Sequence, residues 1–321
     1  VKHYKERAFM GFAEVITNIS TLLGFIKFCK EDISKFNPDK LIFIDNSGFN
    51  LRIAKWAKTN NFYTIYYISP QVWASRSGRV KDIKRDIDEM YVILPFVEDF
   101  YKKHDYKVTF VGHPLLDAIA NRKQVREADF RKEYELGEKP IIALLPGSRK
   151  QEIKKLLAVM LKMADKFTAY QFVIAGAPSQ DYQFYQQFIS KENVRFVSNK
   201  TYDLLSVSYA AIVTSGTATL ETALFKVPEI VCYKTSWLSY QIGKRLIDLK
   251  YISLVNLIMN KEVVKELIQN DFNEITLEEE LHKILNDDVR TKMFLNYFDL
   301  ERELGGKGAS LKTAKLIVKK S

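Results

Sequence analysis

The stretch IIALLPGSRKQEI, residues 141–153, combines a buried strand, a tight turn and the start of a helix. Five apolar residues end at Pro146 and Gly147, as expected of a strand covered on both faces. Apolar residues then recur at the spacing of an amphipathic helix: Ile153, Leu156, Leu157, Met160 and Leu161. A strand that passes through a short turn into a helix is the unit of a parallel α/β sheet.

The turn itself is a candidate anion site. Unpaired backbone N–H groups at a helix start attract an anion, and Gly147 permits its close approach. Arg149 would hold two of the anion's oxygens, because guanidinium binds such groups in a bidentate way. The alternative is an ordinary turn in which Ser148 caps the helix and Arg149 points into water. These residues alone leave both interpretations open.

The same alternation of strand and helix runs along the chain. Nine strands are predicted, at 41–45, 63–69, 90–94, 108–112, 141–145, 172–177, 194–197, 210–215 and 229–233. A charged stretch at 121–140 separates four of them from five, so we expect two Rossmann-like parallel-sheet domains, 1–125 and 126–304. The helix at 305–321 is expected to pack back on the first domain. Two such sheets place a ligand cleft at the carboxyl ends of their strands.

Composition narrows the class of protein. The chain has 321 residues, 47% of them hydrophobic and 27% charged, which is typical of a soluble globular protein. Its net charge of +10 favours an acidic partner such as a lipid headgroup or a phosphorylated substrate. The lysines are scattered and no nucleic-acid-binding motif occurs, so nucleic acid is not expected. Cys29 and Cys232 lie in apolar runs and are interpreted as reduced core residues of a cytoplasmic protein.

The apolar segment 16–28 is a possible membrane contact, although no run reaches the length needed to span a bilayer. Its helical stripe favours burial against a sheet over contact with lipid. Exposure of Leu23, Phe25 and Phe28 would favour the lipid interpretation.

A second turn resembles the first. The segment SGTATLE places Ser215, Gly216 and Thr217 after a strand, and Glu221 on the helix that follows. Hydroxyls and a glycine at a helix start suit phosphate oxygens, and a carboxylate can accept both hydroxyls of a sugar diol. The alternative is a capping box, whose spacing is one residue shorter. Two such turns indicate a site for a nucleotide diphosphate sugar, with Arg149 neutralising the leaving diphosphate.

The other domain is expected to hold the acceptor. Asp45 ends a strand and would take a proton from the attacking hydroxyl, or else would merely cap the next helix. The further acceptor-side residues are Asn50, Ser69, Gln71, Trp73, Arg76 and His113. We interpret His113 as lining the site and not as catalytic. No metal is expected, because Asp86 and Asp88 precede their strand and lie at its amino end.

Six segments together resemble the lipid-A-disaccharide synthase family, in order and over almost the whole chain: YISPQVWASRSGRVKDIK, VILPFVEDFY, TFVGHPLLD, LLPGSRKQEI, SGTATLE and NLIMNKEVVKELIQ. The resemblance implies the two-sheet glycosyltransferase B architecture. It also implies an inverting transfer, without metal or cofactor, from UDP-2,3-diacylglucosamine to 2,3-diacylglucosamine 1-phosphate (lipid X). The products would be lipid A disaccharide 1-phosphate and UDP.

The resemblance also implies roles for single residues. Asp45 and Arg149 match the family's catalytic aspartate and donor-site arginine. The donor-binding residues would be Gly147, Ser148, Ser215, Gly216, Thr217, Glu221, Asn256, Glu266 and Gln269. By the same resemblance the enzyme is cytoplasmic and peripheral on the inner membrane of a Gram-negative bacterium. It is expected to be a homodimer that exchanges C-terminal segments.

One departure and two alternatives accompany this interpretation. The glycine-containing strand and turn with which the family opens does not occur after Val1, so the first β-α unit is expected to be missing from the chain. A UDP-N-acetylglucosamine 2-epimerase would use similar sheets and nucleotide turns. A membrane-surface protein without catalysis would bind liposomes independently of nucleotide.

Overall fold

The computed structural model describes residues 19–75, 77–235, 240 and 249–319. The chain divides into a first unit, Val1–Val111 with Leu311–Ser321, and a second unit, Gly112–Ser310. The division therefore falls before the position at 125 expected from the sequence. The reason is local: the segment after Gly112 packs on the residues around Leu304 and Ala309, whereas Val111 completes the core of the first unit.

The first unit is built on a parallel sheet of four strands in the order β1-β2-β3-β4. The strands are β1 (Lys40–Ile44), β2 (Tyr63–Tyr67), β3 (Glu89–Val92) and β4 (Thr109–Phe110). The helices are α2 (Ile19–Phe36), α3 (Ser47–Thr59), α4 (Val72–Ser75), η2 (Ser77–Arg79), α5 (Val80–Asp86), α6 (Phe96–Lys102) and the last helix, α18 (Ala309–Lys319). Short connections between strand and helix make each strand end at the same edge of the sheet.

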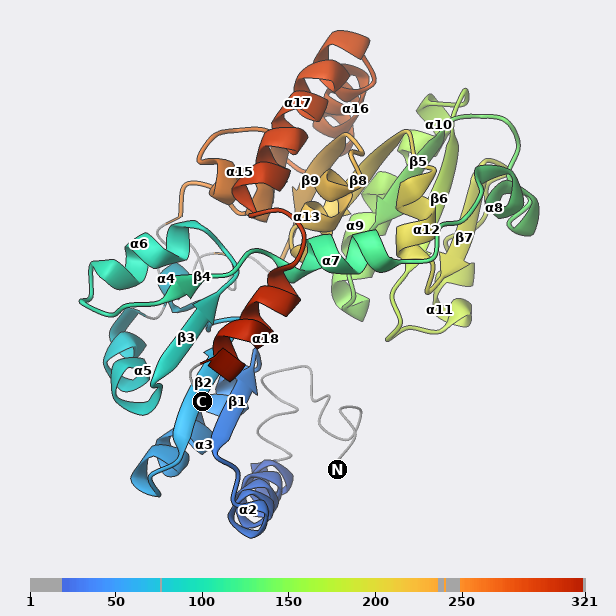
Figure 1. Ribbon diagram of the computed structural model, residues 1–321. Coiled ribbons are helices and arrows are strands. Elements are labelled where there is room, and N and C mark those ends of the chain that lie inside the picture. Colours follow the sequence, from blue (N-terminus) through green and yellow to red (C-terminus); the bar gives the residue numbers. More distant parts are fainter. Residues whose placement is uncertain (1–18, 76, 236–239, 241–248, 320–321) are drawn as a thin grey trace. The chain divides into compact units, whose positions relative to one another are not determined.

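The last helix of the chain belongs to the core of this first unit (Figure 1). Leu316 and Ile317 of α18 pack against buried Ile65, Tyr91 and Val111. The ammonium of Lys40 on β1 donates to the carbonyl of Ile317 at 2.7 Å. Residues from both ends of the sequence thus form one hydrophobic cluster.

The second unit contains a parallel sheet of six strands in the order β10-β9-β8-β5-β6-β7. The strands are β5 (Ile141–Leu145), β6 (Gln171–Gly176), β7 (Val194–Ser198), β8 (Ala210–Thr214), β9 (Glu229–Tyr233) and β10 (Lys265–Ile268). The helices are α7 (Pro114–Asn121), α8 (Glu127–Glu133), α9 (Lys150–Met160), α10 (Met163–Lys166), α11 (Tyr182–Gln186), α12 (Thr201–Ser206), α13 (Thr217–Leu224), α15 (Leu254–Met259), α16 (Glu274–Ile284) and α17 (Asp287–Glu303). The predicted fold class, two parallel α/β sheets, is confirmed.

The strand order of the second unit reverses at its centre. Strand β5 pairs with β6 on one side and with β8 on the other. The chain therefore winds in opposite directions from this point, and right-handed connections place α9 and α13 on opposite faces of the sheet. Ligands of open α/β sheets bind beyond the carboxyl ends of the strands at such a reversal. The two turns identified in the sequence follow β5 and β8.

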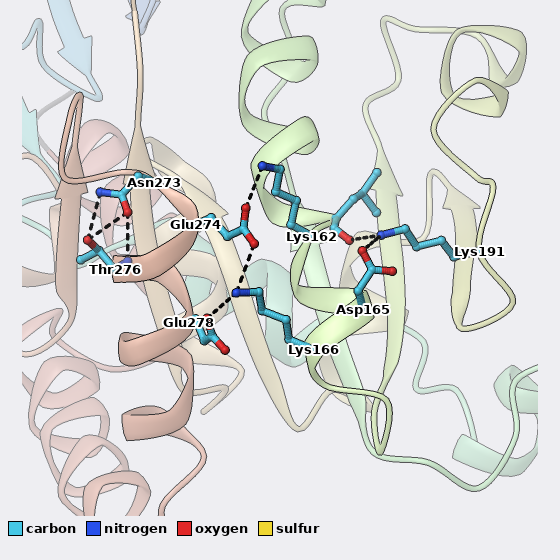
Figure 2. Close-up of polar contacts among 9 residues, drawn as sticks. Lys162, Asp165, Lys166, Lys191, Asn273, Glu274, Thr276 and Glu278 are labelled. Atoms are coloured by element: carbon cyan, nitrogen blue, oxygen red, sulfur yellow. Dashed lines mark hydrogen bonds and ion pairs between the residues drawn. The ribbon is translucent and has the colours of Figure 1, made fainter.

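Polar contacts fix α16 beside α10 at one face of this sheet (Figure 2). Lys162 pairs with Glu274 at 2.7 Å, and Lys166 pairs with both Glu274 and Glu278 at 3.1 and 2.5 Å. Asn273 caps α16 by accepting from the Thr276 backbone N–H at 3.1 Å. Exposed pairs contribute little one by one, at most about 1 kcal/mol each. Together, these ion pairs connect α16, the helix that follows β10, to the segment 162–166.

Within the ranges that the structure describes, no helix is both long and apolar enough to cross a bilayer.

Candidate functional site

The turn after β5 is closed by a carboxylate of its own helix. Arg149 is the N-cap residue of α9, and its side chain makes no capping hydrogen bond. The alternative in which Ser148 caps this helix is therefore not observed. Gly147 has a φ of 97°, which favours glycine. A Cβ on Gly147 would lie 2.7 Å from Oε2 of Glu152, and the N–H groups of Ser148 and Arg149 hydrogen-bond to Glu152. The N–H groups expected to receive an anion therefore already contact the carboxyl group of Glu152.

The surroundings of Glu152 shift its pKa in opposite directions. Burial raises the pKa of Glu152 above its ordinary value. The charge of Arg149 and the two backbone hydrogen bonds lower the pKa by a smaller amount. Arg149, Ser148 and Lys150 are exposed, so the basic side of the turn is open to solvent.

The turn after β8 is open. The Ser215 backbone N–H continues the strand by donating to Cys232 at 2.9 Å, and the Ser215 hydroxyl donates to the Ile252 carbonyl at 3.1 Å. Among the described residues, no atom lies within 4 Å of the position a Cβ would take on Gly216. Thr217 begins α13 directly after it. The backbone at Gly216 is thus accessible to a ligand in a way that the backbone at Gly147 is not.

Glu221 is half-buried on α13 and is held by a neighbouring helix. The hydroxyl of Tyr202 on α12 donates to Oε1 of Glu221 at 2.8 Å. Burial raises the pKa of Glu221, and the Tyr202 hydrogen bond opposes that increase. The capping alternative does not apply, because the N-cap of α13 is Gly216 and has no side chain.

The two turns lie at one edge of one sheet. Leu145 pairs with Val213 in the register of β5 and β8, so Gly147 and Gly216 follow adjacent strand ends. Adjacent strands are about 4.8 Å apart, a spacing that a diphosphate can span. Both glycines are followed five positions later by a glutamate, Glu152 and Glu221. That repeated spacing was the available signal for Glu152, which the sequence interpretation missed. Tyr202 carried no such signal.

A buried amide and a carboxylate hold the segment beside the open turn. Asn256 is fully buried, and its amide group bonds Val263, Val264 and Glu266 at 2.7–3.0 Å. Glu266 accepts the backbone N–H groups of Ile252 and Ser253 at 3.0 and 2.9 Å. Asn256 was expected to line the nucleotide, and the structure shows its side chain bonded within the chain. It positions Glu266, which positions the carbonyl bonded to Ser215.

Gln269 follows β10 at the same sheet edge. Its φ is 55°, and its side-chain oxygen accepts the Thr235 backbone N–H at 3.0 Å. Its backbone N–H donates to Tyr233 at 2.8 Å. Gln269 thus holds the segment that follows β9. Strand β10, which carries Glu266, was not among the nine predicted strands.

In the first unit, Asp45 is exposed at the carboxyl end of β1. Asp45 and Asn46 have φ values of 47° and 40°, in the left-handed region that costs energy for residues with a side chain. Asn50 donates to the carbonyls of Ile44 and Asp45 at 3.0 and 2.8 Å, and the Tyr66 hydroxyl also donates to the Asp45 carbonyl. The N-cap of α3 is Asn46, so Asp45 does not cap this helix.

A second strained position follows β2. Ile68 has a φ of 61°, an outlier for a β-branched residue, and Ser69 comes directly after it. Gln71 is exposed, whereas Trp73 packs edge-on against Phe96 with ring centroids 4.8 Å apart. Arg76 lies outside the described residues. Positive φ values thus occur directly after both β1 and β2, and the one at Ile68 is the most strained because its side chain is β-branched.

His113 was expected on the acceptor side, and the structure places it at the start of α7. It lies in the second unit, is buried, and caps α7 by accepting the Leu115 N–H at 3.2 Å on Nδ1. Burial lowers the pKa of His113 to about 4, so the imidazole is neutral and bonded within the chain. It is a structural cap.

The Asp86-Ile87-Asp88 segment lies at the amino end of β3, as expected. Asp86 pairs with Arg85 at 2.6 Å. Asp88 accepts the Thr64 N–H at 2.9 Å and pairs with Lys58. Both carboxylates hold the fold together at the edge of the sheet away from the strand ends discussed above.

Comparisons with known proteins identify the family to which the chain is similar. A family model described as lipid-A-disaccharide synthetase matches residues 1–318. The lipid-A-disaccharide synthase of Syntrophus aciditrophicus (strain SB) is 39% identical over 327 residues, covering 98% of this chain and 85% of that protein. The lipid-A-disaccharide synthase of Coxiella burnetii (strain CbuG_Q212) is 35% identical over 316 residues, covering 97% of this chain and 83% of that protein.

Solved structures share the fold at low sequence identity. UDP-GlcNAc 2-epimerase from Neisseria meningitidis bound to UDP-GlcNAc has a TM-score of 0.69 at 14% identity and covers 97% of this chain and 83% of that chain. The calicheamicin glycosyltransferase CalG4 has a TM-score of 0.57 at 12% identity, covering 99% and 81%. At these identities the likeness concerns the fold alone, so it gives no support to the epimerase alternative.

Proposed function

The chain belongs to the lipid-A-disaccharide synthetase family and is a glycosyltransferase of lipid A biosynthesis, and on this premise we propose its substrates, mechanism and site. The donor is UDP-2,3-diacylglucosamine and the acceptor is 2,3-diacylglucosamine 1-phosphate. The bond between the donor's C1 and the diphosphate breaks, and a β-1,6 bond to the acceptor hydroxyl forms with inversion. The products are lipid A disaccharide 1-phosphate and UDP.

One observation carries the donor half of this proposal: two glycine turns follow adjacent strand ends where the strand order reverses. Backbone N–H groups beside Gly216 and the guanidinium of Arg149 bind the diphosphate and neutralise it as it leaves. Glu221 accepts hydroxyls of the ribose. Glu266 and Asn256 hold the neighbouring segment, and Gln269 fastens the chain after β9.

The acceptor half rests on Asp45. An exposed carboxylate on a strained turn, with its backbone fixed by Asn50 and Tyr66, is suited to take the proton of the attacking hydroxyl. In this proposal the proton leaves the acceptor as the new C–O bond forms, so the transfer needs no metal. Ser69, Gln71 and Trp73 follow the next strand end and bind the acceptor sugar.

A transfer assay tests the proposal. The purified chain is incubated with both lipid substrates, UDP release is followed, and the disaccharide is identified by mass spectrometry and its anomeric coupling by NMR. We expect Asp45→Ala to lower kcat about 100- to 10,000-fold, as loss of a general base does. The control is Asp39→Ala, which changes an exposed aspartate of the same unit, and its kcat should equal that of the native chain. UDP release without an acceptor requirement, or an α-linked product, would contradict the proposed reaction.

Association with the inner membrane of a Gram-negative bacterium belongs to the same proposal. Helix α2 exposes Leu23 by 58% and Phe28 by 40%, whereas Phe25 is half-buried. Apolar side chains beside Lys27 and Lys30 suit the boundary of an anionic bilayer. Flotation with phosphatidylglycerol vesicles should retain the native chain, and Leu23→Ser with Phe28→Ser should release it. Unchanged flotation would exclude α2 as the contact.

The homodimer with exchanged C-terminal segments is likewise proposed from the family. Light scattering during size-exclusion chromatography measures it, and a mass of one chain at micromolar concentration would exclude it.

A further inference from the structure

Tyr202 and Glu221 come from different helices and meet through one hydrogen bond. Tyr202 is on α12 and Glu221 on α13, and the donor hydroxyl lies 2.8 Å from Oε1. A carboxylate has two oxygens, each able to accept further hydrogen bonds. Tyr202 therefore fixes one oxygen and leaves Oε2 for another donor.

The ring of Tyr202 is itself held. It packs on Phe225 with ring centroids 5.3 Å apart at 53°, and Phe225 packs against the buried cluster under β5 and β8. The guanidinium carbon of Arg122 lies 4.8 Å from the centre of the Phe225 ring. A cation over an aromatic face stabilises such a stack. This packing restricts the ring of Tyr202 on the side where it contacts Phe225.

The Tyr202 hydroxyl stays protonated, and its hydrogen bond favours the charged form of Glu221. Burial and the nearby Glu221 charge raise the pKa of Tyr202 well above its ordinary value, so the phenol keeps its proton. Burial also raises the pKa of Glu221, and the hydrogen bond from Tyr202 works against this. Removing the hydroxyl would loosen Glu221 and make its carboxylate easier to protonate.

We propose that Tyr202 is a positioning residue that aims Glu221 at the ribose of the donor, and that this pair selects ribose over 2′-deoxyribose nucleoside diphosphates. The inference rests on the proposed nucleotide site. A missing 2′-hydroxyl would leave a fixed, half-buried carboxylate oxygen without its donor, which is costly when the carboxylate cannot turn away. A loosely held Glu221 would rotate and lose this preference.

Calorimetric titration of the full chain with UDP and with 2′-deoxy-UDP tests the proposal. The native chain should bind UDP about tenfold more tightly, since a hydrogen bond to a charged group has about that value. Tyr202→Phe should weaken UDP about tenfold, leave 2′-deoxy-UDP nearly unchanged, and so remove the preference. The loss should grow at lower pH, because Glu221 protonates more easily without Tyr202.

Two further variants make the result decisive. Tyr106→Phe removes a hydroxyl that donates to the Ile87 carbonyl at 2.9 Å in the first unit, and it should leave both affinities unchanged. In a Glu221→Gln background, Tyr202→Phe should have no additional effect. Thermal unfolding of each variant separates lost folding from lost binding.

The outcomes separate the two proposals. If the native chain does not bind UDP, the proposed function fails. If UDP binds, and Glu221→Gln removes the ribose preference but Tyr202→Phe keeps it, the role of Tyr202 is overturned while the function stands. Tighter UDP binding by Tyr202→Phe would also overturn it, because Tyr202 would then compete with the ribose.

Discussion

The two glycine turns of the second unit have the same sequence pattern, but a described side chain fills only one of them. Each has a glycine after a buried strand and a glutamate five positions later. Glu152 reaches back and fills the turn at Gly147, whereas Glu221 turns toward Tyr202 and leaves Gly216 open. A helix start therefore does not by itself supply a vacant anion site. The direction of one nearby carboxylate decides whether it does.

Within this comparison, the largest effect is expected from removing the charge of Arg149 at the turn after β5. If Glu152 fills the N–H groups there, Arg149 must carry most of that turn's attraction for the diphosphate. Arg149→Ala should lower kcat/KM about 100- to 1,000-fold in the transfer assay. Lys154→Ala, an exposed cation on the same helix, should change it little. More than half of the native rate in Arg149→Ala would break the comparison.

The next effect concerns stability. Gly147→Ala places a side chain at a φ of 97°, so we expect it to lower the free energy of unfolding of the second unit by about 1–3 kcal/mol, and the Glu152 carboxylate, 2.7 Å from the new Cβ, would have to turn away. Gly137→Ala, with nothing within 4 Å among the described residues, is the matched control. Urea denaturation measures both. Equal stability of the two variants would show that the backbone at Gly147 does not keep this φ in solution.

Neutralising Glu152 and neutralising Glu221 should change the affinity for UDP in opposite directions. Glu221→Gln should weaken UDP about tenfold by removing a charged acceptor. Glu152→Gln should tighten UDP severalfold, because an internal anion no longer competes for the N–H groups.

The gain from Glu152→Gln should depend on pH. The pKa of Glu152 is raised, so the native carboxyl is neutral at low pH and competes only as pH rises through that raised value. The difference between native and variant affinity should therefore increase with pH in calorimetric titrations. Weaker UDP binding by Glu152→Gln at neutral pH would show that Glu152 supports the ligand.

The smallest effect sharpens the description of the open turn. The Ser215 hydroxyl donates to the Ile252 carbonyl at 3.1 Å. Ser215→Ala should cost about 0.5–1.5 kcal/mol in thermal or urea unfolding. UDP affinity should fall only slightly if the hydroxyl holds the chain and does not bind phosphate. Ser206→Ala, whose hydroxyl donates locally within α12, serves as the comparison.

Most of the fold was accessible from the sequence because buried parallel strands are continuous apolar runs. Nine such runs were recognised, and each overlaps an observed strand. The exception, β10, has only four residues, and two of them, Lys265 and Glu266, are charged. It is an edge strand whose pairing with β9 depends on tertiary contacts. Periodicity carries no information about such a strand.

The candidate site was less accessible, for reasons that individual residues make plain. Positions at strand ends followed from topology, which is why Asp45, Gly147 and Gly216 lie at carboxyl edges as predicted. Side-chain partners did not follow, since Glu152, Tyr202 and the burial of Asn256 depend on rotamers and on packing between helices. His113 looked like a site residue for the same reason that it caps α7: both uses follow a strand end.

The return of α18 to the first sheet has a consequence for biosynthesis. Val111, Ile65 and Tyr91 lack Leu316 and Ile317 until α18 leaves the ribosome, about 200 residues after Val111. Domains ordinarily fold in order of synthesis, N-terminal first. Here the second unit is one continuous segment, Gly112–Ser310, and is able to fold before the first unit, whose core stays incomplete until α18 has been synthesised.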